Sequence, residues 1–359
     1  MTNYDVIITP ARNKFDTIQL FRFIAALTVI IFHSTKYTAE RLSPNFPSYD
    51  QGGSNGVNLF FVISGFVMII SSQKLMKDQD GWKIFSLKRA IRIIPIYWIL
   101  TTYKVLTLIF AASLITHAGK LDLGFIIKSY LFIPALNAQN TFFPTYNVGW
   151  TLNFEVFFYV FFAISLWLKL RPIFFLGAIF ISFSILSLYQ NESWPDYRFY
   201  FNPIVLHFLY GMVIGKLILL KREIPKSLTF PIMIVGLLYL FLPKIGVLAI
   251  VFGNNKILLN LATFLVVFAG ASVQNTEIKI PKWVVFLGGA SYSLYLIHPS
   301  VAPLAPMMLK HLKLDMPWLS LLLATGISLI AGSIFYKYCE TPLTEFITRK
   351  VIKVKNTTE

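Results

Sequence analysis

The sequence predicts an all-α, polytopic membrane protein, a helical bundle of about ten transmembrane helices. Of the 359 residues, 56% are hydrophobic and only 13% are charged. A soluble domain carries roughly twice that charged fraction. Apolar runs of about 20 residues, the length at which a helix crosses a bilayer, recur along almost the whole chain. These runs leave no room for a separate soluble domain, so we expect one integral membrane domain over residues 1–359.

The individual spans follow from the apolar runs. We expect them at 15–35, 56–73, 93–116, 150–169, 172–189, 201–220, 228–243, 246–273, 283–308 and 317–337. The eighth run is interrupted by polar residues at 253–256. The segment 125–134 is too short to cross, and we expect it to lie at an interface or to re-enter the membrane.

The distribution of Lys and Arg predicts the orientation. With a cytoplasmic N-terminus, the inside segments hold 21 of the 32 basic residues and the outside segments hold nine. Because cytoplasmic loops carry the excess of positive charge, we expect both termini inside, with short cytoplasmic tails at 1–14 and 338–359. The first run contains Arg22 and lacks a small-residue cleavage site, so we expect it to stay in the mature protein.

Two kinds of partner are not expected. The net charge of +16 would suit a nucleic acid, but the basic residues lie in short loops between apolar runs rather than on one folded face. The five histidines and the single cysteine, Cys339, show no ligand spacing, so we expect no metal.

Arg22 and His33 stand out within the first apolar run, because a charged residue at the bilayer centre costs on the order of 3 kcal/mol. They are eleven residues apart, which is about three helical turns and ~16 Å, so both project from one face. We expect Arg22 in the inner half of the membrane and His33 near the outer surface. Snorkelling of Arg22 to inner headgroups and interfacial anchoring of His33 is the alternative.

Three further stretches carry candidate residues. Ser64 and Gly65 form a small-residue step in the second span, where another helix can approach closely. Lys88, Arg89 and Arg92 precede the third span at its cytoplasmic edge, where two guanidiniums could clamp a phosphate. The positive-inside rule alone would also explain them.

The fourth span opens at Trp150 and carries Glu155 one or two turns below the outer surface. A lone carboxylate among phenylalanines needs a partner, and His33 is the nearest one by predicted depth. In the ninth span, Ser291, Tyr295 and His298 share one stripe, with His298 toward the outside.

Taken in order, these motifs resemble the acyltransferase-3 family of integral-membrane exopolysaccharide and O-antigen O-acyltransferases. The resemblance covers nearly the whole chain. Its motifs are Arg22-x10-His33, Phe60-Phe61-x-x-Ser64-Gly65, Arg89-x-x-Arg92, Trp150-Thr-Leu-x-x-Glu155, Ser291-Tyr-Ser-Leu-Tyr-Leu-Ile-His298-Pro and Glu340-x-Pro342. The last is equally consistent with a helix stop at the inner face. Lys88, Asn58 and Thr341 depart from residues that are frequent in the family.

The resemblance implies about ten spans and transfer of an acyl group, commonly acetyl, from cytoplasmic acyl-CoA to a hydroxyl of a glycan or lipid-linked sugar. It also implies a bacterial inner membrane, essential roles for His33 and Arg22, and CoA binding by Arg89 and Arg92, with Lys88 beside them.

These expectations combine into one mechanism. CoA would be held at the inner face, and its pantetheine arm would pass Arg22. Neutral His33 would act as the general base, with Glu155 fixing its tautomer and stabilising the imidazolium formed. An acyl-histidine intermediate is the other route. Tyr295 and His298 are expected to serve the acceptor pocket or the oxyanion, and Trp150 and Ser64 to contact substrate.

Aromatic residues near the outer end, Phe142, Phe143, Tyr146 and Trp150, suit sugar stacking and equally an interfacial aromatic belt. A carrier or export component for a polysaccharide or lipid-linked sugar is the alternative function, since intramembrane Arg, His and Glu also occur in proton-coupled carriers. A purely structural subunit is a third. The acyl group, the acceptor and the oligomeric state, a homo-oligomer included, stay open.

Overall fold

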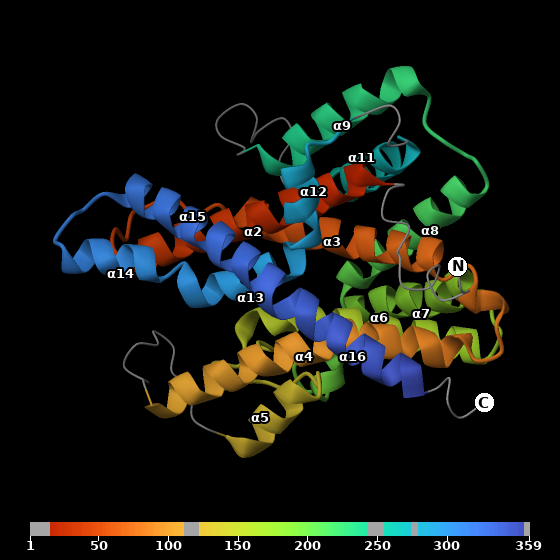
Figure 1. Cartoon of the computed structure of the whole chain (residues 1–359), viewed down its shortest axis with the longest axis horizontal. Coiled ribbons are helices and arrows are strands. Elements are labelled where there is room, and N and C mark those ends of the chain that lie inside the picture. Colours follow the sequence, from red (N-terminus) through yellow and green to blue (C-terminus); the bar gives the residue numbers. More distant parts are fainter. Residues whose placement is uncertain (1–14, 111–121, 243–254, 274–278, 355–359) are drawn as a thin grey trace. The chain divides into compact units, whose positions relative to one another are not determined.

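The computed structural model describes residues 15–110, 122–242, 255–273 and 279–354, and every regular element in these ranges is helical (Figure 1). Six of these helices are long and apolar enough to cross a membrane, or seven if one bent pair counts as a span. Three shorter apolar helices, Pro203–Leu219, Lys226–Phe241 and Lys256–Ser272, occupy three further predicted spans. The all-helical membrane class is therefore confirmed. The count of ten spans and the cytoplasmic termini stay predictions.

The chain divides into two compact units, which are described separately. Unit 1 comprises Met1–Gln73 and His207–Ser333, and unit 2 comprises Lys74–Leu206 and Ile334–Glu359. The polar interruption predicted at 253–256 lies mostly outside the described residues, since α11 begins at Lys256.

Unit 1 is built around two long helices, α2 (Asp16–Arg41) and α3 (Asp50–Ser71). Its other helices are α8 (Leu206–Leu219), α9 (Lys226–Phe241), α11 (Lys256–Ser272), α12 (Lys282–Gly289), α13 (Ser291–Val301), α14 (Leu304–His311) and α15 (Pro317–Phe335). Side chains of α2, α3, α8, α9 and α11 form its apolar core, with Phe21 and Phe66 fully enclosed. The core holds α2 against several neighbours and so fixes the helix that carries Arg22 and His33.

Glycines let the helices of unit 1 approach to backbone contact. A Cβ atom on Gly65 of α3 would lie 2.0 Å from the Phe208 carbonyl oxygen, and one on Gly211 of α8 would lie 1.9 Å from that of Val62. The Ser64–Gly65 step predicted as a packing gap is therefore the place where α8 crosses α3.

The C-terminal end of α9 is satisfied by side chains of the segment that opens α3. Asn55 is buried and donates to the Leu240 carbonyl oxygen at 2.7 Å, and Gln51 donates to the same oxygen at 3.1 Å. The Tyr49 hydroxyl donates to the Phe241 carbonyl oxygen at 2.5 Å. Burial raises the pKa of Tyr49, so this donor stays protonated. The last carbonyls of a short apolar helix thus have partners within the protein.

Two expectations about unit 1 are wrong. The first helix does not end near residue 35 but continues to Arg41, so His33 lies about two turns before its end. The run 283–308 is not one helix: α12 and α13 meet at a 69° bend. Gly288 and Gly289 are the last residues of α12, and Ala290 separates it from α13. Apolarity alone cannot report either feature.

Unit 2 is built on α4 (Gly81–Phe110), α6 (Trp150–Trp167) and α7 (Pro172–Leu186). Short elements surround them: η1 (Leu75–Lys77), α5 (Leu123–Tyr130), η3 (Asn147–Gly149), η4 (Ser187–Tyr189), η5 (Asp196–Tyr200), η6 (Pro203–Val205) and η7 (Tyr336–Glu340), followed by α16 (Thr341–Val354). The eight-residue α5 confirms that the segment after residue 122 is too short to cross.

Helices α4 and α6 run antiparallel. Trp82 and Trp167 lie with ring centroids 6.4 Å apart at one end, and the rings of Phe85 and Phe162 stack at 4.8 Å. At the other end, Gly149 meets the Tyr97 ring. Because α4 starts at Gly81, the basic residues 88, 89 and 92 lie on this helix and not before it, contrary to expectation. The predicted start of the third span was placed after Arg92, because the basic residues end the apolar run. Such charges do not end a helix.

A helix stop at Glu340-x-Pro342, one of the two interpretations that the sequence left open, does not occur. A π-helical turn, Tyr336–Glu340, follows α15 directly and leads into α16. Pro342 directly follows this π-helical turn, as the second residue of α16.

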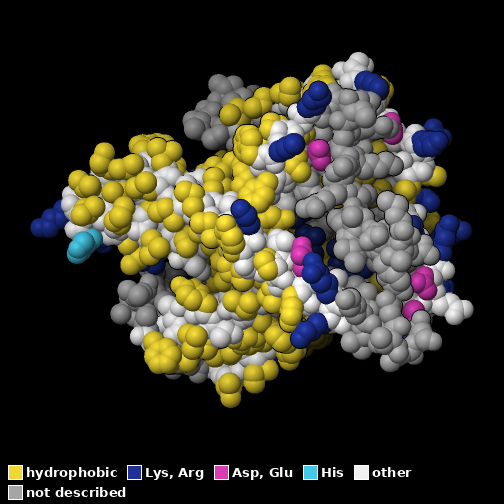
Figure 2. Space-filling model, in the orientation of Figure 1, with side chains coloured by type: hydrophobic (Ala, Val, Ile, Leu, Met, Phe, Trp, Pro, Cys, Tyr) yellow, Lys and Arg dark blue, Asp and Glu magenta, His cyan; other side chains and the backbone are white. Residues whose placement is uncertain are grey.

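Apolar surface faces outward from both units, as a lipid-exposed protein requires. Figure 2 shows hydrophobic side chains gathered over α4 and α5 and over α14 and α15. Among them, Phe110 is 81% exposed and Leu322 is 70% exposed.

Candidate active site

The first cluster of candidate residues lies in unit 1, where α13 packs on α2. The imidazole rings of His33 and His298 lie with centroids 4.8 Å apart. His298 is fully buried, whereas His33 is partly exposed. The rings of Phe32 and Tyr37 flank His33 at 4.6 and 6.2 Å. The His33 side chain therefore lies among the rings of Phe32, Tyr37 and His298.

The hydrogen bonds of the two imidazoles define which nitrogen is basic. Nδ1 of His33 lies 3.0 Å from the Val29 carbonyl oxygen, and Nδ1 of His298 lies 3.3 Å from that of Leu294. A carbonyl oxygen only accepts, so each Nδ1 carries the proton and each neutral ring keeps its lone pair on Nε2. Among the described residues, Nε2 of His298 has no hydrogen-bond partner. A buried acceptor of this kind is suited to a hydroxyl donor from a substrate.

Tyr295 joins this cluster. Its ring lies 5.9 Å from the His298 ring and 6.0 Å from the Phe60 ring of α3. The predicted stripe of α13 thus faces α2 and α3 within unit 1.

Arg22 lies farther along α2, and Ser64 lies farther along α3. Arg22 donates to the Gln19 side-chain oxygen at 3.2 Å. Helices α2 and α3 are antiparallel, since a Cβ on Gly53 would meet the Phe32 ring and one on Gly56 would meet the Ala25 carbonyl. Ser64, two turns beyond Gly56, is therefore placed toward the Arg22 end of α2.

The bend between α12 and α13 lies at this same end. A Cβ on Gly288 would fall 2.1 Å from the Gln19 carbonyl oxygen, so the break packs directly on α2. Broken helices in membrane proteins occur where irregular backbone is enclosed by protein or lines a polar path. The Arg22 and His33 ends of α2 are both lined by the α12–α13 segment.

The second cluster lies in unit 2, between α4 and α6. The Arg89 guanidinium lies 5.6 Å from the Tyr159 ring centroid and hydrogen-bonds the Tyr159 side chain. The Tyr159 hydroxyl donates in turn to Glu155 Oε1. Arg89 is also attracted by the Glu155 carboxylate and repelled by the Arg92 guanidinium. A chain of polar contacts therefore links Arg89, Tyr159 and Glu155 inside an apolar helix pair.

This arrangement differs from the predicted depths. Arg89 was expected at the cytoplasmic edge and Glu155 near the outer surface, yet they interact within one unit. The reason is the length of α4, in which Arg89 lies eight residues after Gly81, about 12 Å along the axis. The expected pairing of Glu155 with His33 joins the two units and stays a prediction.

Trp150 is the first residue of α6 and belongs to an aromatic group. Its ring lies 6.5 Å from that of Phe143 and 6.1 Å from that of Phe154. Phe142 packs with Phe199 at 5.5 Å, while Tyr146 is buried. Of the four aromatic residues expected near the outer end, Tyr146 is thus the least able to meet a ligand.

Sequence reasoning missed two residues that shape these clusters. Tyr159 lies four residues after Glu155 on one face of α6, and this i, i+4 spacing was a signal that could have found it. The Val29 carbonyl that fixes His33 has no sequence signal, because every residue has one. No group of three or more His, Cys, Asp or Glu side chains suited to a metal occurs in the part of the chain that the structure describes.

Intramembrane histidine, arginine and carboxylate groups on an all-helical scaffold define the class of this protein as an integral-membrane enzyme or carrier. Comparison with known proteins decides between the two. The model of an acyltransferase domain, the acyltransferase-3 family, matches residues 15–337, and the chain belongs to this family.

Two curated relatives agree with this assignment. The exopolysaccharide production protein ExoZ of Rhizobium meliloti (strain 1021) is 30% identical over 274 residues, covering 75% of this chain and 80% of that protein. The candidate O-acetyltransferase SACOL0978 of Staphylococcus aureus (strain COL) is 27% identical over 354 residues, covering 89% of this chain and 56% of that protein. No solved structure matches the chain. The protein is thus a membrane O-acyltransferase, which transfers groups other than amino-acyl groups.

Proposed function

We propose that this enzyme moves an acyl group, most simply acetyl, from cytoplasmic acyl-CoA to a hydroxyl of a surface glycan or lipid-linked sugar in a bacterial inner membrane, with His33 as the general base. The observation that carries the proposal is the pair of imidazoles. Each Nδ1 donates its proton to a backbone carbonyl, so each Nε2 keeps the lone pair that can accept a proton. The names of the two relatives supply the acceptor class and the acetyl group.

The chemistry assigned to His33 is direct. Nε2 takes the proton of the acceptor hydroxyl as its oxygen attacks the thioester carbonyl carbon. The tetrahedral intermediate then expels the CoA thiolate, which recovers the proton from the imidazolium. General base catalysis of this kind contributes roughly 10²–10⁴ in rate, and orientation of the two substrates adds to it.

His298 is assigned to holding the hydroxyl of the sugar substrate and not to stabilising the oxyanion. Its Nδ1 proton is engaged by Leu294, so neutral His298 offers only an acceptor at Nε2. An acceptor nitrogen can hold the substrate hydroxyl but cannot stabilise a negative oxygen. Tyr295, whose hydroxyl can donate, is the better candidate for the oxyanion.

Arg89 and Arg92 are assigned to the phosphate groups of acyl-CoA, with Lys88 beside them. Arg22, in unit 1, stays a separate candidate for binding the donor. Arg89 and Arg92 lie three residues apart on α4, so their side chains share a face, and guanidiniums bind phosphate oxygens with two parallel hydrogen bonds. Tyr159 and Glu155 hold Arg89 in place from α6.

The role of Glu155 changes in this proposal. The sequence suggested that it fixes the His33 tautomer, but Val29 already accepts the Nδ1 proton. We therefore assign Glu155 to positioning Arg89. Stabilisation of the His33 imidazolium stays the alternative role, and the two are separated by the kinetic test in the Discussion.

Incubation of the purified protein in lipid nanodiscs with radiolabelled acetyl-CoA and an exopolysaccharide fragment tests the function. We expect base-labile label in the glycan, as an O-ester requires, and free CoA in equal amount. Solute uptake by vesicles without any such turnover would support the carrier alternative and overturn the proposal.

A further inference from the structure

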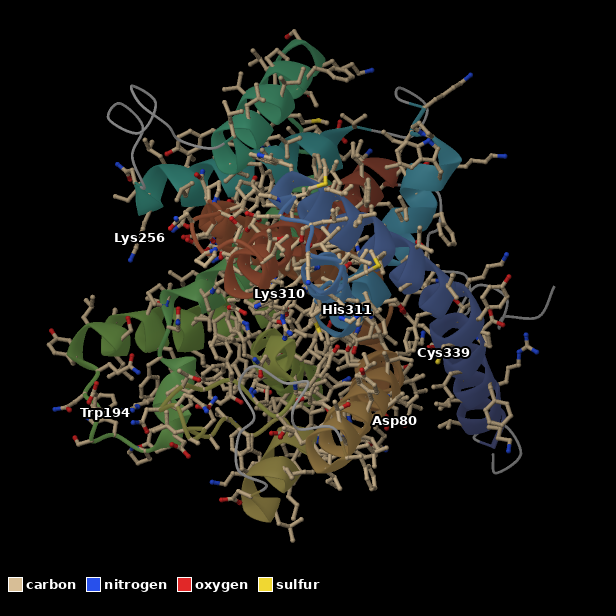
Figure 3. All side chains as sticks on the ribbon, turned by 90° about the vertical axis from the view of Figure 1, so that its left-hand side faces the viewer. Asp80, Trp194, Lys256, Lys310, His311 and Cys339 are labelled. Carbon is tan, nitrogen blue, oxygen red and sulfur yellow. The ribbon has the colours of Figure 1, made fainter. Side chains whose placement is uncertain are left out.

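Unit 2 contains a cavity that the acyl-transfer chemistry does not use. It lies between the end of α5 and the η5 segment, with a volume of about 480 Å³. Lys128, Phe132 and Pro134 line one side, and Asp196, Tyr197 and Tyr200 line the other. This volume is in the range of small-molecule sites. Trp194, labelled in Figure 3, marks the loop that leads into η5.

The α5 wall is held in a strained conformation. Phe132 has a φ of 57°, the left-handed region that a bulky residue rarely adopts. It ends α5 in the position where glycine is usual, and the Ile133 N–H donates to the Lys128 carbonyl oxygen at 2.9 Å. Lys169, Lys221 and Lys313 end their helices in the same conformation, so the feature particular to Phe132 is that a bulky ring is held there by its surroundings.

Contacts around Phe132 enforce the strained conformation. Its ring packs against Tyr97 with centroids 4.7 Å apart, and its carbonyl oxygen accepts a hydrogen bond from the Tyr200 hydroxyl at 3.4 Å. Burial raises the pKa of Tyr200, so the hydroxyl remains a donor. The Tyr200 ring stacks on Phe157 of α6 at 4.1 Å. Both walls of the cavity are therefore tied to the helices of unit 2.

The lining combines aromatic faces with one ion pair. Lys128 Nζ lies 3.9 Å from Asp196 Oδ2, and both side chains are about half exposed. The Tyr197 ring is 56% exposed. A saccharide presents an apolar C–H face that packs on an aromatic ring, and hydroxyls that both donate and accept hydrogen bonds. The carboxylate accepts and the ammonium donates, whereas a phosphate would meet the negative charge of Asp196.

The charge distribution in unit 2 predicts which side of the membrane the cavity faces. Lys169 donates to the Asp78 carbonyl oxygen, so the loops before α4 and after α6 lie at one end. That end is rich in Lys and Arg and is predicted to be cytoplasmic. The cavity is far from it, because α5 bonds to Tyr97 and Trp98, about 24 Å along α4 from Gly81. The cavity is thus predicted on the outer side.

We propose that this cavity is a saccharide-binding subsite, which holds a sugar unit of the acceptor through Tyr197, Lys128 and Asp196. The inference rests on the proposed function for the kind of acceptor, but the binding of sugar is independent of catalysis. The sugar can belong to a free glycan or to a lipid-linked precursor, since both present the same ring to the cavity.

Saturation-transfer NMR on the full protein in lipid nanodiscs tests the subsite. The probes are methyl glycosides of glucose, galactose and rhamnose, and the octyl glycosides of the same sugars below their micellar concentrations. We expect saturation of the ring protons of at least one sugar. Preference for the octyl form indicates a lipid-linked acceptor, and equal binding indicates a free glycan.

Variants assign the binding to this cavity. Tyr197→Ala and Asp196→Asn are expected to weaken it at least tenfold. Tyr189→Ala is the matched control, because Tyr189 is 72% exposed, lies in the same unit and does not line the cavity. We expect it to bind like the unaltered protein.

The proposal is overturned by no saturation of any probe, by equal binding in Tyr197→Ala and the control, or by competition from inorganic phosphate, which would indicate an anion site. Acetyl-CoA turnover is measured on the same samples. Sugar binding without turnover would overturn the proposed function and leave the subsite standing, and turnover without sugar binding would do the reverse.

Discussion

The imidazole rings of His33 and His298, more than 250 residues apart in sequence, lie with centroids 4.8 Å apart, and a backbone carbonyl engages the Nδ1 proton of each. The sequence did not predict this pair, because a similar predicted depth in the membrane does not show which helices are neighbours. The surroundings of the two rings differ, since His33 is partly exposed and His298 is fully buried.

Replacing His33 by Ala is expected to lower acyl transfer by about 10²–10⁴, the range of general base catalysis. Transfer of label from acetyl-CoA into glycan is the measurement. His311→Ala is the control, because His311 is exposed at the end of α14 (Figure 3). Normal transfer by a folded His33→Ala protein would remove His33 from the mechanism.

Replacing His298 by Ala is expected to raise the KM for the acceptor about two- to tenfold, the loss of one hydrogen bond, and to leave the KM for acyl-CoA unchanged. His298→Gln keeps an acceptor atom and should recover most of the affinity. Steady-state kinetics with each substrate varied in turn measures both. A fall in kcat as large as that of His33→Ala, at unchanged acceptor KM, would instead place His298 in the proton transfer.

The contact between Arg89 and Tyr159 predicts a different kinetic effect. Glu155→Gln and Tyr159→Phe are each expected to raise the KM for acyl-CoA about tenfold, because both loosen Arg89. The double variant should be little worse than the single ones, since the two groups act through one chain of contacts. Tyr103→Phe, on the exposed face of α4, is the control.

The same variants test the alternative role of Glu155. If Glu155→Gln lowers kcat, shifts its pH profile and leaves the KM for acyl-CoA unchanged, then Glu155 acts on His33 and the positioning of Arg89 is wrong.

The helical class and the candidate residues could be predicted from the sequence because apolar length and intramembrane charge are local properties. The helix ends could not. The first apolar run ended before Lys36, yet α2 continues to Arg41. The third run began after Arg92, yet α4 begins at Gly81. Charge changes the hydropathy of a window without breaking the backbone hydrogen bonds of a helix.

Side-chain partners were harder still to predict. Glu155 was assigned a partner by depth alone, and the i+4 neighbour Tyr159 on its own helix was overlooked. The break between α12 and α13 was missed because Gly288 and Gly289 are as apolar as their neighbours. Gly288 lets α12 pack closely on α2, since a Cβ there would lie 2.1 Å from the Gln19 carbonyl oxygen, and hydropathy does not record such a close approach.

The crossing of α3 and α8 gives the last prediction, for stability rather than chemistry. A Cβ on Gly211 would lie 1.9 Å from the Val62 carbonyl oxygen and 2.6 Å from the Phe66 nitrogen. These are backbone atoms that cannot swing aside, so Gly211→Ala must separate the two helices, at a cost of about 3 kcal/mol. Gly326→Ala is the matched control, because no atom lies within 4 Å of a Cβ there and alanine favours a helix by about 1 kcal/mol. Thermal unfolding followed by size-exclusion chromatography should show a lower melting temperature for Gly211→Ala and an equal or higher one for Gly326→Ala. Equal stability of the two variants would mean that α3 and α8 are not in backbone contact.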